Sequence, residues 1–159
     1  LRSAWSWLKT NSTARHLFTI EDDMVLERPV DLEELALVVD RHPYLAQMAL
    51  RRQAWGPVEE AAGGVVESHP DSYTDREWGG FAWLEHRNFF TSNCSLFRWS
   101  LLDVGWPDVP RSEGVFSHRL FAEGFGGVPG DQVRCGYFGA RTEPPLLTHI
   151  GVERAGVGY

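Results

Sequence analysis

Cysteine, basic runs and long apolar segments are all scarce in this sequence. The two cysteines, Cys94 and Cys135, are too few for a disulfide framework and are not spaced as zinc ligands. We therefore expect both to be reduced, in a cytoplasmic protein. The net charge is −7 and there is no basic block, so nucleic-acid binding is not indicated. No apolar run is long enough for a transmembrane helix.

Aromatic residues are abundant, with seven tryptophans and nine phenylalanines in 159 residues. Such side chains suit a hydrophobic core that also carries a groove for stacking sugars or bases. Hydrophobic residues make up 43% of the chain and charged residues 23%, which is ordinary for a globular protein. Length and composition together predict a single domain over residues 1–159.

Apolar periodicity and turn signals predict an α/β fold, a mixed sheet flanked by helices. Asp31 and Glu34 have the spacing of a capping box, and Ser112 is the expected N-cap of a later helix. The inner faces of these two helices are expected to be Leu32, Leu35, Val38 and Val39, and Val115, Phe116 and Leu120. The polar residues 67–79 predict a loop, and residues 141–159 a tail. The expected helices are 3–14, 31–41 and 113–123, and the expected strands are 16–20, 44–50, 65–66, 80–86, 94–99 and 133–138.

An acidic stretch, HLFTIEDDMVL at residues 16–26, is the feature with the most chemical content. A short strand-like apolar run, predicted to be buried, ends in the consecutive acids Glu21, Asp22 and Asp23. Burying carboxylates without a counter-charge is costly, and a divalent cation is a common counter-charge. The alternative is a solvated acidic turn. In α/β sheets, ligands gather at the carboxyl ends of strands, which is where this stretch is expected to lie.

This stretch resembles the acidic metal-binding motif of nucleotide-sugar glycosyltransferases with the GT-A fold. Three later stretches follow in the order expected for that fold. Residues 89–102 (FFTSNCSLFRWSLL) are similar to its acceptor-side segment, and residues 112–120 (SEGVFSHRL) resemble the catalytic-base segment of inverting members of glycosyltransferase family two. Residues 148–151 (THIG) are similar to the late segment whose histidine completes the metal shell. The resemblance implies a partial GT-A-like, Rossmann-like mixed sheet.

Two features depart from the family pattern. The base position is Glu113 where the family usually has Asp, and it is preceded by Ser112 instead of Glu, although Arg119 and Leu120 follow at the usual offset. The family's N-terminal nucleotide-binding half also has no counterpart before residue 3. Because the chain starts at Leu1 and not at Met, we expect it to be either the metal and acceptor-side portion of a longer protein or a shortened relative.

The resemblance implies roles for the acidic stretch and the late histidine. Asp23 and His149 would be ligands of Mn²⁺ or Mg²⁺. Glu21 or Asp22 would bind the ribose of the donor or a metal-bound water. The alternatives without the resemblance are that Asp22 is a structural acid that caps the turn and that His149 is an ordinary loop histidine.

The resemblance also implies an acceptor side. Glu113 would be the general base that deprotonates an acceptor hydroxyl, although the helix macrodipole alone favours glutamate in a first helical turn. Asn93, with Ser92, would hydrogen-bond the donor or acceptor sugar, and simple turn chemistry would explain both residues as well. A sugar-stacking wall or part of the core would be formed by Trp78, Phe81, Trp83, Phe89 and Phe90.

The leading hypothesis is a metal-dependent transfer of a sugar from a nucleoside-diphosphate sugar to the hydroxyl of a carbohydrate or another acceptor, which the resemblance at Glu113 implies to be inverting. One alternative is a metal-dependent phosphoesterase or nuclease, to whose site His149 and Asp131 would contribute. The other is a non-catalytic carbohydrate-binding remnant of the fold. The sequence leaves the donor sugar, the nucleotide base and the acceptor open.

Overall fold

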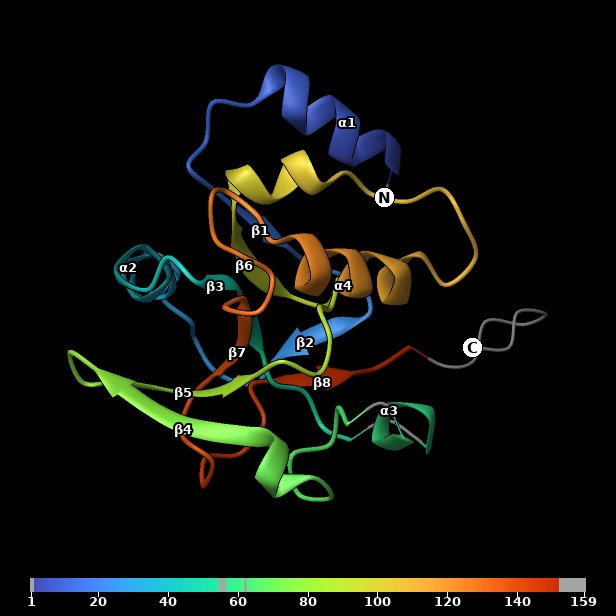
Figure 1. The fold of residues 1–159 in the computed structure, drawn as a ribbon. Coiled ribbons are helices and arrows are strands. Elements are labelled where there is room, and N and C mark those ends of the chain that lie inside the picture. Colours follow the sequence, from blue (N-terminus) through green and yellow to red (C-terminus); the bar gives the residue numbers. More distant parts are fainter. Residues whose placement is uncertain (1, 55–56, 62, 152–159) are drawn as a thin grey trace.

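A computed structural model describes residues 2–54, 57–61 and 63–151. The fold is mixed α/β, with a mostly antiparallel six-stranded sheet in the order β1-β6-β3-β7-β5-β4 and a separate two-stranded sheet, β2-β8 (Figure 1). The strands are β1 (His16–Thr19), β2 (Met24–Leu26), β3 (Leu45–Leu50), β4 (Tyr73–Trp78), β5 (Phe81–His86), β6 (Ser95–Arg98), β7 (Arg134–Phe138) and β8 (Leu147–His149). The helices are α1 (Arg2–Asn11), α2 (Leu32–Arg41), α3 (Pro57–Ala61) and α4 (Ser112–Glu123), with 3-10 turns η1 (Pro70–Ser72) and η2 (Trp99–Val104).

Strand direction brings several chain segments to one edge of the large sheet, the edge formed by the carboxyl ends of β1 and β3. Both β1 and β3 pair antiparallel with β6, so β1 and β3 run in the same direction and end at the same edge. Strand β6 begins at this edge, because Ser95 lies opposite Thr19 and Ala49, so the segment before β6 lies there too. An isolated bridge between Arg52 and Leu147 joins β8 to this edge.

The large sheet has a hydrophobic layer on each face. On one face, α1, η2 and α4 pack against β6 and β7, as the upper part of Figure 1 shows. The other face is covered by α2 and by the chain entering β8. The strand β3 is central and all six of its residues are buried, which explains its continuous apolar sequence LAQMAL, broken only by Gln47.

Helix α2 is confirmed close to its predicted bounds. Asp31 is its N-cap, and the Asp31 carboxylate accepts a hydrogen bond from the backbone N–H of Glu33 at 2.8 Å. Leu35, Val38 and Val39 are fully buried, as predicted. Leu32, which we placed on the same face, is 42% exposed, so the buried face begins at Leu35.

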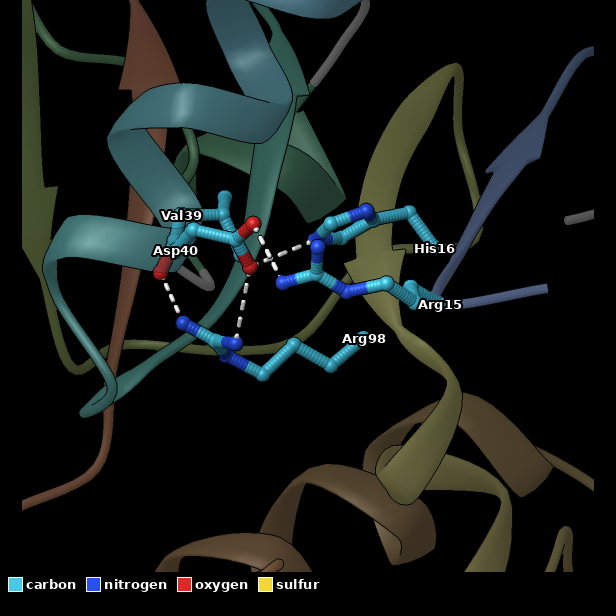
Figure 2. Close-up of polar contacts among 5 residues, drawn as sticks. All are labelled: Arg15, His16, Val39, Asp40 and Arg98. Atoms are coloured by element: carbon cyan, nitrogen blue, oxygen red, sulfur yellow. Dashed lines mark hydrogen bonds and ion pairs between the residues drawn. The ribbon is translucent and has the colours of Figure 1, made fainter.

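A charged cluster fixes the C-terminal end of α2 to the neighbouring strands β1 and β6. The Asp40 carboxylate accepts hydrogen bonds from Arg15 Nη2 at 2.9 Å and Arg98 Nη1 at 3.2 Å, and lies 2.9 Å from His16 Nε2 (Figure 2). Arg98 also donates to the backbone carbonyl of Val39. An aspartate in the last turn of a helix opposes the macrodipole, so these partners offset an otherwise unfavourable charge.

We expect Asp40→Ala to lower the free energy of unfolding by about 2 kcal/mol, because hydrogen bonds to charged groups contribute about 1.5–3 kcal/mol. Urea unfolding measures the change. The matched control is Asp75→Ala, which removes the exposed carboxylate paired with Arg141 at 2.9 Å and should cost less than about 1 kcal/mol. Equal losses in the two variants would contradict a structural role for the Asp40 cluster.

The buried His86 lies among aromatic rings at the end of β5. Its ring centroid is 4.8 Å from that of Phe89, 5.1 Å from Tyr73 and 5.2 Å from Tyr137. Burial lowers the pKa of His86 to about 3. Its Nδ1 accepts a long hydrogen bond of 3.4 Å from the backbone N–H of Asn88, so the folded protein holds the neutral ring.

His86 should make the fold acid-sensitive. Unfolded histidine titrates near pH 6.5, so between about pH 6.5 and pH 3 the unfolded chain binds the extra proton. The contribution of His86 to stability is therefore complete above pH 6.5 and declines as the pH falls through this window. We expect His86→Gln to flatten the pH dependence of urea unfolding between pH 7.5 and 4.5. The exposed His118→Gln should leave it unchanged, and an unchanged slope in His86→Gln would refute the assignment.

Several sequence predictions are wrong. The polar segment 67–79 is not all loop, because residues 73–78 form the edge strand β4, whose outward positions tolerate charge. Strand β1 lies where we predicted it but is half-buried, since β6 is its only partner. No strand forms at residues 65–66, where Val66 lies in a turn.

Two helix predictions and the C-terminal prediction also need correction. Ser112 is the first helical residue of α4, and the N-cap is Arg111, at φ 56° with no side-chain cap. Val115 is 39% exposed, whereas Phe116 and Leu120 are buried as predicted. The predicted tail contains β8, and residues 152–159 lie outside the described residues.

Both cysteines are free and buried. None of the helices in the described ranges is long and apolar enough to cross a membrane.

Candidate functional site

The acidic stretch forms the turn between β1 and β2. The backbone N–H of Met24 donates to the carbonyl of Glu21 at 3.3 Å, which closes a four-residue turn with Asp22 and Asp23 at its centre. Asp22 is exposed, whereas Asp23 is half-buried. The carbonyl of Asp23 accepts a hydrogen bond of 2.8 Å from the N–H of Ile150, so its backbone is tied to the strand that carries His149.

Asp23 and His149, 126 residues apart in sequence, meet at this turn. The His149 Nε2 atom lies 3.1 Å from Asp23 Oδ2. The pairing of β2 with β8 places Met24 opposite His149 and so brings the two side chains together. Gln53, just beyond β3, holds the His149 backbone from the other side, with Nε2 donating to the carbonyl at 3.1 Å and Oε1 accepting from the N–H at 3.0 Å.

Gly151 lies in close contact with this pair. A Cβ atom at Gly151 would lie 2.6 Å from Asp23 Oδ2 and 3.0 Å from His149 Nε2. The first distance is shorter than real Cβ contacts and the second is tighter than most of them, so a residue with a side chain at this position would crowd the carboxylate and the imidazole. The absence of a side chain at Gly151 therefore lets the chain pass close to Asp23 and His149.

A second group of polar side chains surrounds Glu21. In the amide orientation that satisfies both neighbours, Asn93 Nδ2 donates to Glu21 Oε2 at 3.2 Å and Asn93 Oδ1 accepts from Arg52 Nε at 3.1 Å. Arg52 also pairs with Glu59 at 3.1 Å. Burial raises the pKa of Glu21, and the carboxylates of Asp23 and Glu113 raise it further, while His149 and Arg52 act in the opposite direction.

Glu113 lies in the first turn of α4 and faces this group. Its Oε1 accepts a hydrogen bond from the backbone N–H of Ser92. The same helix also binds Phe90, two residues before Ser92, because Ser117 Oγ accepts a hydrogen bond from the N–H of Phe90 at 2.8 Å. The predicted catalytic base and the predicted sugar-binding segment are therefore in direct contact.

Asp23 and His149 form a hydrogen bond or ion pair in this structure, and the spacing of their two atoms is also compatible with two ligands of one divalent cation. Two ligands at about 2.1 Å from one ion and at right angles to each other are about 3.0 Å apart, close to the separation of Asp23 Oδ2 and His149 Nε2. Within residues 2–54, 57–61 and 63–151, no three His, Cys, Asp or Glu side chains converge tightly enough to hold a metal alone. Mg²⁺ sites often use one or two carboxylates and take their other ligands from substrate phosphates and water.

Other predicted participants lie elsewhere. Asp131 precedes β7 at the edge opposite the ends of β1 and β3, so it does not join Asp23 and His149. Trp83 and Phe90 are core residues, each at most 2% exposed, whereas the other predicted stacking residues are half-buried: Trp78, Phe81 and Phe89.

Sequence reasoning missed Arg52, Gln53 and Gly151 as parts of the site. The pair Arg51-Arg52 directly after a buried strand was a signal for the first of them. Nothing local marks Gln53 or Gly151, since their roles depend on the pairing of β8 with β2.

Comparisons with protein-family models, with curated proteins and with solved structures found no match to this chain. The interpretation of the site therefore depends on its own geometry.

Proposed function

We propose that this chain carries the metal-binding and acceptor-binding parts of a metal-dependent glycosyltransferase with a GT-A-like fold. The donor would be a nucleoside-diphosphate sugar and the acceptor a carbohydrate or other hydroxyl compound. The observation that carries the proposal is the convergence of Asp23, His149, Glu21, Asn93 and Glu113. These residues come from four separate stretches of the chain and gather at one edge of the sheet.

Asp23 and His149 would hold the cation, Mn²⁺ or Mg²⁺, of which a nitrogen ligand favours Mn²⁺ somewhat. The bound cation would neutralise the negative charge that develops on the diphosphate leaving group. Glu21 lies near Asp23 and accepts a hydrogen bond from the Asn93 amide in the orientation described above. It would contact the donor ribose or a water molecule. Asp22 is exposed in the turn and would contribute charge without a direct contact.

Glu113 would act on the acceptor. Its carboxylate takes the proton of the acceptor hydroxyl while the acceptor oxygen bonds to the anomeric carbon. The bond from that carbon to the diphosphate oxygen breaks on the opposite side, and its electron pair leaves with the nucleoside diphosphate. A single displacement of this kind inverts the anomeric configuration. The contact of Glu113 with Ser92 supports this assignment, because it places the carboxylate beside the segment proposed to bind sugar.

The proposal predicts that a nucleoside diphosphate raises the melting temperature only when Mn²⁺ is present. At a ligand concentration one hundred times the dissociation constant, the stabilisation is about 2.7 kcal/mol. We expect Gly151→Ala to abolish this shift, because its methyl group would lie 2.6 Å from Asp23 Oδ2 and 3.0 Å from His149 Nε2 and would crowd both proposed ligand atoms.

The matched control is Gly114→Ala, where an added Cβ meets nothing within 4 Å. That variant should keep the full Mn²⁺-dependent shift. Stabilisation of Gly151→Ala equal to that of the unmodified protein would overturn the placement of the metal.

A further inference from the structure

The segment 90–93 is held by side chains that come from other elements. Gln47, in β3, makes two hydrogen bonds to one residue of this segment: its Oε1 accepts from the N–H of Thr91 at 2.8 Å, and its Nε2 donates to the carbonyl of Thr91 at 2.9 Å. Within the segment, Thr91 Oγ1 accepts from the N–H of Asn93 at 3.2 Å. The Asn93 carbonyl in turn accepts from Thr19 Oγ1 at 3.1 Å.

Gln47 is an unusual residue at its position. It lies in the centre of the sheet, opposite Phe97 on β6 and Cys135 on β7, and is 1% exposed. A buried amide without partners would cost about 1–3 kcal/mol, so the pair of bonds to Thr91 is what makes glutamine acceptable there. An apolar residue of the same length would fill the space equally well but would leave the Thr91 backbone unpaired.

The bonds to Thr91 also affect the two residues that follow it. The next N–H, from Ser92, is the group that contacts Glu113, and the residue after it, Asn93, contacts Glu21. A displacement of Thr91 would therefore move the partner of the proposed base and the partner of Glu21 together. Gln47 itself touches neither of these acids in the described structure.

We propose that Gln47 is a positioning residue for the acceptor side of the site, acting through Thr91 to place Ser92 against Glu113. This proposal depends on the proposed function, because it assigns Gln47 to the step in which the acceptor is deprotonated. Errors of about 1 Å in the placement of reacting groups cost about a hundredfold in rate.

The metal side of the site has its own, separate anchor, which supplies a comparison. Gln53 makes the same two-bond contact with the backbone of His149 that Gln47 makes with Thr91. The two glutamines extend from one strand and its immediate continuation but hold different segments. Loss of the Gln47 contact should therefore leave the His149 side intact.

The structural part of the test is amide hydrogen exchange. In Gln47→Met, which keeps length and burial but cannot pair with Thr91, we expect the Ser92 N–H to exchange at least about tenfold faster. The His149 N–H should exchange as before. Met48→Ala, on the opposite face of β3, is the control for general destabilisation and should affect both amides alike. Unchanged Ser92 exchange in Gln47→Met relative to Met48→Ala would overturn the proposal.

The functional part of the test compares binding with turnover. We expect Gln47→Met to keep the affinity for Mn²⁺ with a nucleoside diphosphate within about twofold. We expect kcat for Mn²⁺-dependent release of nucleoside diphosphate from a nucleotide sugar to fall about 10- to 100-fold. A kcat no lower than that of Met48→Ala would also overturn the proposal. If Gln47→Met does not fold, Gln47→Glu, which keeps the acceptor for the Thr91 N–H and loses the donor, is measured in the same way.

Failure of the proposed function has a different signature. In that case the unmodified protein would bind no nucleoside diphosphate in a Mn²⁺-dependent way, whatever residue stands at position 47. Faster Ser92 exchange without Mn²⁺-dependent binding would confirm the anchoring and reject glycosyl transfer, and with it the role of Gln47 in that reaction.

Discussion

Asp23→Asn should abolish Mn²⁺-dependent sugar transfer, lowering kcat/KM by at least about a thousandfold, which corresponds to about 4 kcal/mol of transition-state stabilisation. The amide keeps the size of the side chain but loses the charge that a cation requires. The neutral amide oxygen is a weaker ligand than the carboxylate, so the cation would depend mainly on the His149 imidazole, whose Nε2 lies 3.1 Å from Asp23 Oδ2. Release of nucleoside diphosphate from a nucleotide sugar, with and without Mn²⁺, measures the effect.

Asp22→Asn is the matched control, since it removes the same charge one residue away from an exposed position. We expect this variant to keep activity within about tenfold, the loss coming from long-range electrostatics alone. If Asp22→Asn lost as much activity as Asp23→Asn, the acidic turn would act through its net charge and not through one ligand.

Glu113→Gln should lower kcat by about 10²–10⁴-fold and leave the Mn²⁺-dependent affinity for nucleoside diphosphate unchanged. The amide oxygen can still accept the hydrogen bond from Ser92, so the segment next to α4 keeps its place. What is lost is the group that takes the acceptor proton. Steady-state turnover and thermal shift, measured on the same preparation, separate these two effects.

Glu123→Gln is a suitable control, because it removes a carboxylate from the other end of the same helix. Turnover in that variant should be unchanged. Normal turnover in Glu113→Gln would instead mean that Glu113 serves α4 only, as a favourable charge at the helix N-terminus.

The parts of the fold that follow local rules could be predicted from sequence. The bounds of α2 follow from its cap and its apolar face, and β3 follows from a run of small and apolar residues. Strand β4 was missed because the pattern TDREW has no buried face to reveal, and its strand form comes from pairing with β5 alone. The strand β8 was missed because it is short: only three of its residues pair with β2.

For the candidate site, the sequence suggested residues but not the contacts that hold them. The order of the four stretches predicted roles for Asp23, Asn93, Glu113 and His149, and these residues lie near one another at one edge of the sheet, which leaves their roles a prediction. The side chains that fix them, Gln47 and Gln53, bind backbone groups of distant segments. Contacts of that kind leave no periodic or spacing signal, because a backbone partner has no sequence identity.

The central claim is that Asp23 and His149 hold a cation that binds a nucleoside diphosphate. Isothermal titration of UDP, and separately GDP, into the protein with saturating Mn²⁺ or with EDTA tests it most directly. We predict binding at least about tenfold tighter with Mn²⁺ for one of these nucleotides, a difference of about 1.4 kcal/mol, and no such difference in Asp23→Asn. Equal affinity with Mn²⁺ and EDTA, or no binding of either nucleotide, would contradict it.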